Sequence, residues 1–270
     1  MSTTTQTPLE KVLAKAESEN RAALIGYLPA GFPTVAGCKA AIDVLVEVGF
    51  DAIEIGYPYS DPVMDGPIIQ EAADMALRNG VKAKDVIATL AHAHERAVAA
   101  VVMTYWNPIE QYGADAFARA IAESGGSGVI TPDLSYEQAQ PWKESANDAG
   151  INTIFVVAPS TSEERLKKVT RISSGFIYAA SLMGVTGTRT AISNSAKDLV
   201  ARIRNVTDLP VAVGLGVSTP DQAREVAKYA DGVIIGSALI KELLGKDLHE
   251  GLANLKKLAT SLVDATKGAR

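Results

Sequence analysis

The sequence has 270 residues, 47% of them hydrophobic and 21% charged, which is the composition of an ordinary globular protein. The formal net charge is −5 and no long basic run occurs, so we expect no nucleic-acid partner. Cys38 is the only cysteine, which excludes an internal disulfide.

The N-terminus, Met1 to Pro8, is polar and lacks the apolar core of a signal peptide. No uninterrupted apolar run is long enough to span a bilayer, so we expect a cytoplasmic protein without a membrane partner. The histidines form no metal-binding pattern, because His92 and His94 point to different sides of a predicted helix and His249 is distant in sequence. We therefore expect no metal site.

Short apolar runs alternate with amphipathic segments along the chain, beginning with a helix at residues 9–16. The predicted strands cover residues 22–28, 52–56, 100–104, 128–131, 153–157, 175–180, 210–214 and 232–236. The predicted helices after them cover residues 35–48, 67–78, 83–96, 115–123, 136–148, a stretch after Ser162, 195–205, 219–229, a short stretch from Ser237, and 248–262. Residues 105–108 and 181–190 are expected to be loops.

Turn and capping residues support several of these boundaries. Thr34 is placed to cap the second helix, and Gly49 to end it, because glycine tolerates the left-handed conformation at a helix C-terminus. Pro67 suits the first turn of a helix, where its missing N–H is not needed. Either Ser218 or Thr219 is placed to cap the helix after the seventh strand.

Eight short apolar strands that alternate with helices predict parallel strands joined by helical crossovers. Eight such units in about 250 residues favour a closed (β/α)8 TIM barrel over a doubly wound open sheet. No dinucleotide-binding fingerprint follows the first strand, which also argues against the open sheet. No linker rich in proline or serine divides the chain, so we expect one α/β barrel domain over residues 1–270, with an extra N-terminal helix.

The stretch at residues 51–67 has the strongest functional signal. Its first part alternates like a buried strand and contains Glu54, whose carboxylate is costly to bury unless it is paired or used. The loop that follows holds three prolines and two further acids, Asp61 and Asp65. One interpretation is that Glu54 is a salt-bridged core residue. The other is that Glu54 and Asp65 form a carboxylate pair for acid–base chemistry, which we favour.

In a barrel of this class the active site lies at the C-terminal ends of the strands. Tyr105, Tyr178 and the Thr186–Gly187 pair occupy such positions. Gly187, Gly216 and Gly236 let backbone N–H groups approach an anion, and Ser237 opens a helix whose N-terminus favours negative charge. These glycines predict a phosphate site after the last strands, although each taken alone is equally consistent with a simple turn.

The run from Glu54 to Pro67 closely resembles the signature of tryptophan synthase alpha subunits. The resemblance extends along the chain from about Leu9 onward. Further matching segments are Gly31–Pro33, Met103–Pro108, Thr131–Leu134, Gly184–Gly187 and Gly214–Ser218.

The resemblance implies a lyase that splits indole-3-glycerol phosphate into indole and glyceraldehyde 3-phosphate by a retro-aldol reaction. Glu54 would be the general acid–base, and Asp65 would hold the indole N–H. Tyr105 and Tyr178 would flank Glu54, while Tyr27 and Met103 would wall the indole ring. Thr186 would close over Asp65 and exclude water.

The resemblance also implies a partner. Members of the family carry no cofactor in this subunit, because the pyridoxal phosphate belongs to a separate beta subunit of an alpha2-beta2 heterotetramer. The expected contact residues are Tyr57, Pro58, Asp61 and Pro62 in the loop after the second strand, and Asp133.

Other functions stay open at this stage. One is a lyase that releases indole without a beta subunit, and another is a non-catalytic barrel that binds a sugar phosphate and regulates a partner. A generic phosphate-binding isomerase is a third, but it does not explain the loop of prolines and acids.

Overall fold

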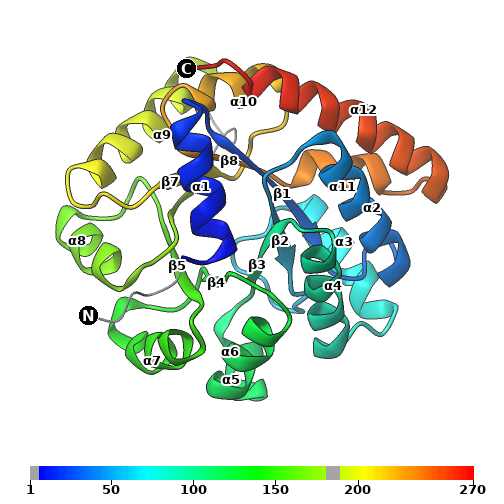
Figure 1. Ribbon diagram of the computed structural model, residues 1–270, viewed down its shortest axis with the longest axis horizontal. Helices are drawn as coiled ribbons and strands as arrows, with labels where there is room; N and C mark the ends of the chain where they lie inside the picture. The colour runs from blue at the N-terminus through cyan, green and yellow to red at the C-terminus, as the bar shows by residue number, and fades with distance from the viewer. Residues whose placement is uncertain (1–5, 181–188) are drawn as a thin grey trace.

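The computed structural model describes residues 6–180 and 189–270, and its strands form the closed parallel barrel that the sequence predicts (Figure 1). The strands follow one another around the barrel in chain order, from β1 to β8, so the open-sheet alternative is wrong. They are β1 (Ala23–Pro29), β2 (Ala52–Gly56), β3 (Ala99–Met103), β4 (Gly128–Thr131), β5 (Asn152–Val157), β6 (Ile177–Ala180), β7 (Val211–Gly214) and β8 (Gly232–Ile235).

Helices surround the barrel, and every connection between successive strands contains at least one helix (Figure 1). They are α1 (Pro8–Ser18), α2 (Val35–Val48), α3 (Pro67–Arg78), α4 (Ala83–Glu95), α5 (Trp106–Tyr112), α6 (Ala114–Glu123), a 3-10 helix (Tyr136–Gln138), α7 (Gln140–Ala149), α8 (Glu163–Ile172), α9 (Arg189–Arg204), α10 (Pro220–Ala227), α11 (Ser237–Leu243) and α12 (Leu248–Thr266). None of the helices in this part of the chain is long and apolar enough to cross a membrane.

Several predicted boundaries are confirmed at the level of hydrogen bonds. The Thr34 hydroxyl accepts from the Gly37 N–H, and Gly49 ends α2 in the left-handed conformation, with φ 102°. Thr219, not Ser218, caps α10, where its hydroxyl accepts from the Gln222 N–H.

The structure differs from the sequence-based expectation in three segments. Residues 106–108, expected as loop, begin helix α5. The first N–H of this helix, that of Trp106, donates to the carboxylate of Asp133. The helix expected at 136–148 is instead a 3-10 turn followed by α7, because Pro141 lacks an N–H and suits the first turn of a new helix. Helix α9 begins at Arg189, so residues 189 and 190 are not loop.

Helix α1 lies across the N-terminal end of the barrel (Figure 1) and is fixed there by its own apolar face and by polar contacts. Leu9, Leu13 and Ala16 are buried. The Thr7 hydroxyl donates to Asn152 Oδ1 at 2.7 Å, and Asn152 Nδ2 donates to Glu10 Oε1 at 2.9 Å. Helix α1 therefore packs against the barrel and closes its N-terminal end.

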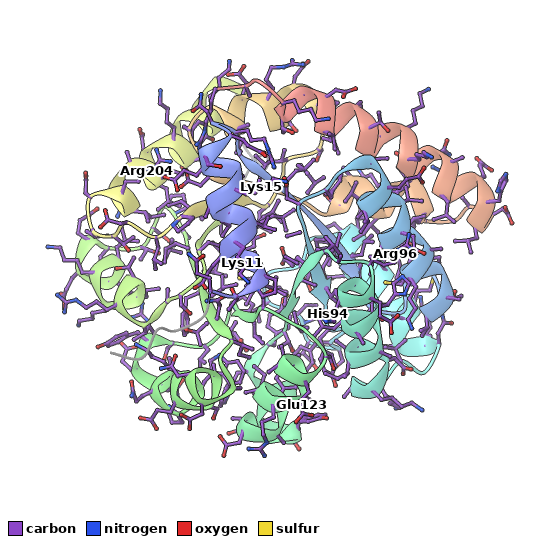
Figure 2. All side chains as sticks on the ribbon, in the orientation of Figure 1. Lys11, Lys15, His94, Arg96, Glu123 and Arg204 are labelled. Carbon is purple, nitrogen blue, oxygen red and sulfur yellow. The ribbon has the colours of Figure 1, made fainter. Side chains whose placement is uncertain are left out.

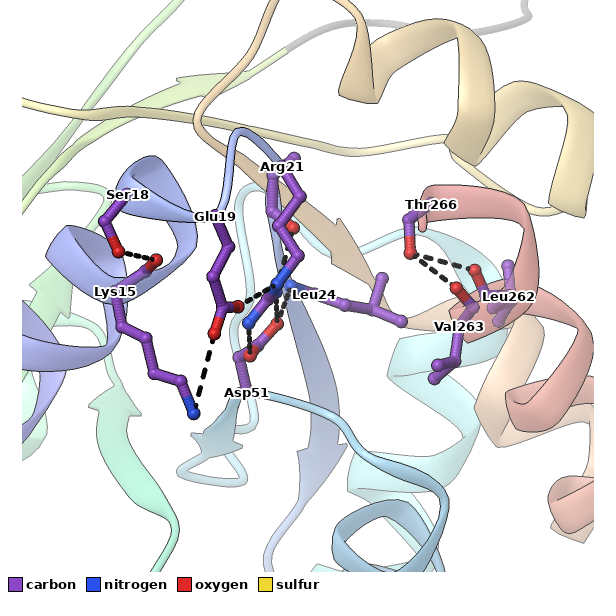
Figure 3. Close-up of polar contacts among 10 residues, drawn as sticks. Lys15, Ser18, Glu19, Arg21, Leu24, Asp51, Leu262, Val263 and Thr266 are labelled. Carbon is purple, nitrogen blue, oxygen red and sulfur yellow. Dashed lines mark hydrogen bonds and ion pairs between the residues drawn. The ribbon is translucent and has the colours of Figure 1, made fainter. Parts of the chain in front are cut away.

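A bidentate ion pair joins the segments that lead into the first two strands (Figure 3). The Arg21 guanidinium donates to both oxygens of Asp51, at 2.7 and 2.8 Å. One of these oxygens also accepts from the Leu24 N–H at 2.8 Å. On the same face, Lys11 and Lys15 extend from α1 and Arg204 from α9 (Figure 2). Charged side chains are thus concentrated at this end of the barrel as well as in the loops that follow the strands.

Candidate active site

A cavity of about 270 Å³ opens where the strands end. Most of the side chains around it are apolar, and the only carboxylates are Glu54 and Asp65. It is lined by Tyr27, Glu54, Met64, Asp65, Gly66, Pro67, Ile68, Ile69, Met103, Tyr178, Leu215, Gly216, Val217, Ile234, Gly236 and Ser237. The structure therefore brings both predicted catalytic carboxylates together with Tyr27, Met103 and Tyr178.

Glu54 lies inside the barrel on β2, paired in register with Tyr27 of β1. The residue is only 2% exposed, and its Oε2 atom has no hydrogen-bond partner in the described part of the chain. Burial, and to a smaller extent the nearby charge of Asp65, raise the pKa of Glu54 to about 8. No cation lowers this pKa, so the salt-bridged alternative finds no support among the described residues.

Asp65 follows β2 in the proline-containing loop and differs from Glu54 in its hydrogen bonding. Burial raises the pKa of Asp65 to about 6, while a hydrogen bond from the Tyr105 side chain acts in the opposite direction. Between pH 6 and 8, Asp65 is therefore ionised while Glu54 is protonated. One cavity thus holds a proton donor and a carboxylate at the same pH.

Tyr105 lies behind Asp65 and is not among the residues that line the cavity. Its hydroxyl accepts from the Met64 N–H at 3.1 Å, and its ring packs on Tyr59 with 5.3 Å between ring centroids. In the next residue, the Trp106 N–H donates to both oxygens of Asp133, at 2.9 and 3.1 Å. The loops after β3 and β4 thus hold the loop that carries Asp65.

Tyr178 packs against a glycine of the neighbouring strand. A Cβ atom built on Gly214 would lie 2.5 Å from Tyr178 Cζ, so only glycine leaves room for this ring. The charge of Glu54 is the largest electrostatic contribution, after burial, that raises the pKa of Tyr178. Tyr178 is therefore close to Glu54.

The other end of the cavity is formed by the glycines predicted to bind phosphate. Gly216, Gly236 and Ser237 all line it. Leu215 and Gly216 both have left-handed backbones, with φ 68° and 97°, which is unusual for a leucine and turns the chain sharply beside the cavity. Thr186 and Gly187, predicted to bind substrate, lie outside the described residues.

The apolar side chains after β7 and along α3 were not identified from the sequence. Leu215, Val217, Ile68 and Ile69 line the cavity. Helical spacing alone does not separate a residue that faces a cavity from one in the core. For Leu215 a signal existed, since it stands between the two glycines Gly214 and Gly216.

The predicted partner-contact residues differ in exposure. Asp61 and Asp133 are exposed, Tyr57 and Pro62 are half-buried, and Pro58 is buried within the chain itself. Val63, at 73% exposed, is the most exposed large apolar side chain described, and its position in the same loop was overlooked in the sequence. Pro58 is covered by its own chain and lies beneath the exposed surface of this loop.

The described residues contain no cluster of three or more potential metal ligands. His92 and His94 lie on α4, outside the cavity. His92 Nε2 lies 2.8 Å from an Asp43 oxygen, and His94 is exposed at the end of α4 (Figure 2). Neither lines the cavity.

Comparison with known proteins gives one consistent result. The family model described as tryptophan synthase alpha chain matches residues 13–267. The tryptophan synthase alpha chain of Streptomyces coelicolor is 52% identical over 262 residues, covering 96% of this chain and 97% of that one. A structure of Mycobacterium tuberculosis tryptophan synthase aligns with a TM-score of 0.89 and 48% identity, over 97% and 99% of the two chains. The alpha subunit from Legionella pneumophila aligns with a TM-score of 0.88 and 31% identity, over 97% and 99%.

The raised pKa of Glu54 predicts a pH-dependent stability. The folded state holds the Glu54 proton up to about pH 8, whereas the unfolded chain loses it near 4.5, so this stabilisation is full below pH 4.5 and is lost as pH rises to 8. A Glu54→Gln variant cannot ionise. Its free energy of unfolding relative to wild type should rise by up to about 1.4 kcal/mol per pH unit across this window.

Urea unfolding of both proteins between pH 5 and 9 measures this difference. Glu71→Gln is a matched control, because Glu71 is exposed on α3 and its difference from wild type should stay constant with pH. A constant difference for Glu54→Gln as well would contradict a buried, protonated Glu54.

Proposed function

Because this chain belongs to the tryptophan synthase alpha chain family, we propose that Glu54 and Asp65 perform the proton transfers of its reaction. That reaction is the cleavage of indole-3-glycerol phosphate to indole and glyceraldehyde 3-phosphate, a carbon–carbon lyase step of tryptophan biosynthesis. The reaction needs no cofactor in this chain; pyridoxal phosphate resides in the beta subunit. The observation that carries the assignment is that the Glu54 and Asp65 carboxyls line one largely apolar cavity, where the pKa of Glu54 is raised above that of Asp65.

The first step places a proton on indole C3. Protonated Glu54 donates it, and the positive charge that results is shared by the ring nitrogen. Asp65, being ionised, accepts the hydrogen bond of the indole N–H and stabilises that charge. The stabilisation is larger in an apolar cavity than in water, because the surrounding medium screens it less.

The second step breaks the carbon–carbon bond. Glu54, now a carboxylate, takes the proton from the hydroxyl on the carbon attached to C3. The O–H electron pair forms the aldehyde C=O, and the electron pair of the broken bond returns to the ring and restores neutral indole. Glu54 is protonated again, so one carboxyl serves as acid and then as base.

The remaining cavity residues are proposed to hold the two ends of the substrate. Met103, Leu215 and Ile234 offer apolar contacts to the flat indole ring. At the glycine end, the backbone N–H groups of Gly216, Gly236 and Ser237 are proposed to bind the phosphate. Thr186 and Gly187 keep their predicted roles as part of this proposal, with Thr186 closing over Asp65.

The chain's partner is the tryptophan synthase beta subunit, with which it forms the alpha2-beta2 heterotetramer. We propose that Tyr57, Asp61, Pro62 and Asp133 contact it. These residues lie in the loops after β2 and β4, at the end of the barrel where the cavity opens. Asp61 and Asp133 are exposed. The bond from the Trp106 N–H to Asp133 gives this surface a physical connection to the loop after β3.

We also propose that residues 1–270 form one domain and that the protein acts in the cytoplasm, where a single cysteine, Cys38, suits the reducing conditions. A single barrel accounts for every strand described. Limited proteolysis that released a stable fragment would contradict the single domain, and fractionation of cells would test the location.

Replacing Glu54 tests the proton shuttle. Glu54→Gln nearly keeps the volume of the side chain but removes its acidity, so turnover should fall by about 10²–10⁴-fold while substrate affinity changes little. Asp65→Asn should also lower turnover, through lost stabilisation of the ring nitrogen. Single-turnover cleavage of indole-3-glycerol phosphate, measured with the dissociation constant, separates these effects.

The same assignment predicts the pH profile. For the wild type, kcat/KM should rise as Asp65 ionises near pH 6 and fall as Glu54 loses its proton near pH 8. Glu71→Gln should behave as wild type. Cleavage by Glu54→Gln at a rate near that of wild type would contradict the mechanism.

The phosphate site is tested by ligand protection. Inorganic phosphate binds only the folded state in this proposal, so Tm should rise with its concentration, and chloride at equal ionic strength should have no such effect. Gly236→Val should remove the protection, because the added side chain covers the amides and presses on Tyr27, whose Cδ1 would lie 3.2 Å from the new Cβ. No shift with millimolar phosphate in wild type would argue against the site.

The partner surface is tested by Asp61→Ala. We expect weak cleavage by the chain alone, a large increase with the beta subunit, and a smaller increase for the variant, because its exposed carboxylate no longer contacts the partner. Glu123→Ala is the control, since Glu123 is exposed at the end of α6, on the face that carries α1 (Figure 2). If Asp61→Ala were activated as strongly as Glu123→Ala, this loop would not be the coupling surface.

A further inference from the structure

The side chain of Tyr27 spans the wall of the cavity between two glycines. Its ring leans on Gly236, where an added Cβ would lie 3.2 Å from Tyr27 Cδ1. Its hydroxyl end lies over Gly56, where an added Cβ would collide with the hydroxyl and lie 2.7 Å from Cζ. The phenol therefore reaches from the end of β8, at the proposed phosphate site, to the end of β2.

This arrangement places the Tyr27 hydroxyl beside the catalytic carboxyl. Gly56 follows Glu54 by two residues on β2, so both residues face the interior of the barrel. Tyr27 is also the register partner of Glu54 across the β1–β2 pair. The groups that act electrostatically on its hydroxyl are Asp65, Glu54, Tyr105 and Tyr178.

The hydroxyl lines the cavity without a partner of its own. No hydrogen bond within residues 6–180 and 189–270 involves it, and the charges that act on it most strongly are those of Asp65 and Glu54. The Oε2 atom of Glu54 is likewise unpaired within these ranges. Since Tyr27 and Glu54 both line the cavity, a polar atom of a bound ligand is within reach of the two side chains together.

We propose that the Tyr27 hydroxyl contacts the substrate directly and donates a hydrogen bond to the hydroxyl oxygen whose proton Glu54 removes. This inference rests on the proposed role of Glu54 as the base. As that proton passes to the carboxylate, negative charge grows on the oxygen until the O–H pair forms the C=O bond. A donor aimed at this oxygen stabilises the transition state more than the ground state.

Tyr27 keeps its own proton throughout this step. Burial raises the pKa of Tyr27 well above its ordinary value, and the charges of Asp65 and Glu54 act in the same direction. The proton that reaches Glu54 therefore comes from the substrate, and the phenol acts as a neutral donor. The two glycines fix its direction, since a side chain at either position would displace the ring.

The test compares Tyr27→Phe with wild type. The variant keeps the ring between its glycines and removes only the hydroxyl, so single-turnover cleavage of indole-3-glycerol phosphate should fall by about 10- to 100-fold. The dissociation constants of indole and of inorganic phosphate should stay within about twofold, because neither probe carries the hydroxyl. Tyr229→Phe is the matched control: its hydroxyl is buried, unpaired within the described residues and remote from the cavity, and its removal should leave cleavage unchanged.

The outcomes separate this inference from the proposed function. If wild type cleaves, Glu54→Gln does not, and Tyr27→Phe cleaves at the wild-type rate, the Tyr27 inference is wrong and the Glu54 assignment stands. A Tyr27→Phe variant that loses indole affinity instead of cleavage rate would also overturn the inference, because the phenol would then serve only as part of the ring wall. If Glu54→Gln cleaves at the wild-type rate, the proposed function itself fails.

Discussion

The active site depends on one constraint, the burial of the Glu54 carboxyl at the end of a barrel strand with no cation beside it among the described residues. An ionised carboxylate in such surroundings would cost several kcal/mol, so the group holds its proton at neutral pH. Protonation of a carbon atom requires an acid that is still protonated at pH 7 and has a pKa near that pH, so that it can transfer its proton to the substrate. The same burial makes Glu54 a cost to stability at high pH, which links catalysis and folding in one residue.

The second carboxyl, that of Asp65, has to be ionised at neutral pH, and a hydrogen bond from a neighbouring loop favours this state. The hydrogen bond from Tyr105 favours the ionised form of Asp65, against the effect of burial. Tyr105 also accepts from the Met64 N–H, so one phenol fixes both the charge and the backbone of the loop. Asp133 in turn bonds the Trp106 N–H. The pair of carboxyls therefore differs in protonation because one lies on a strand and the other in a loop braced by its neighbours.

The two ends of the barrel have separate tasks, as is usual for this architecture. At the N-terminal end, α1 and the Arg21–Asp51 ion pair close the barrel with contacts that do not reach the cavity. At the C-terminal end, Gly56 and Gly214 have no side chain and therefore leave room for the rings of Tyr27 and Tyr178. At this end, the register of β1 and β2 sets Tyr27 beside Glu54.

The sequence by itself determined the barrel, the positions of its strands within a residue or two, and the pair Glu54 and Asp65, because apolar periodicity and residue type are written locally. Only the tertiary structure decided that Tyr105 serves Asp65, that Pro58 is buried and that residues 106–112 form a helix. These facts depend on which loops meet once the barrel closes. Protonation states belong to the same class, since a pKa is set by desolvation and by neighbours in space, and neither can be read from the residues next to it in the sequence.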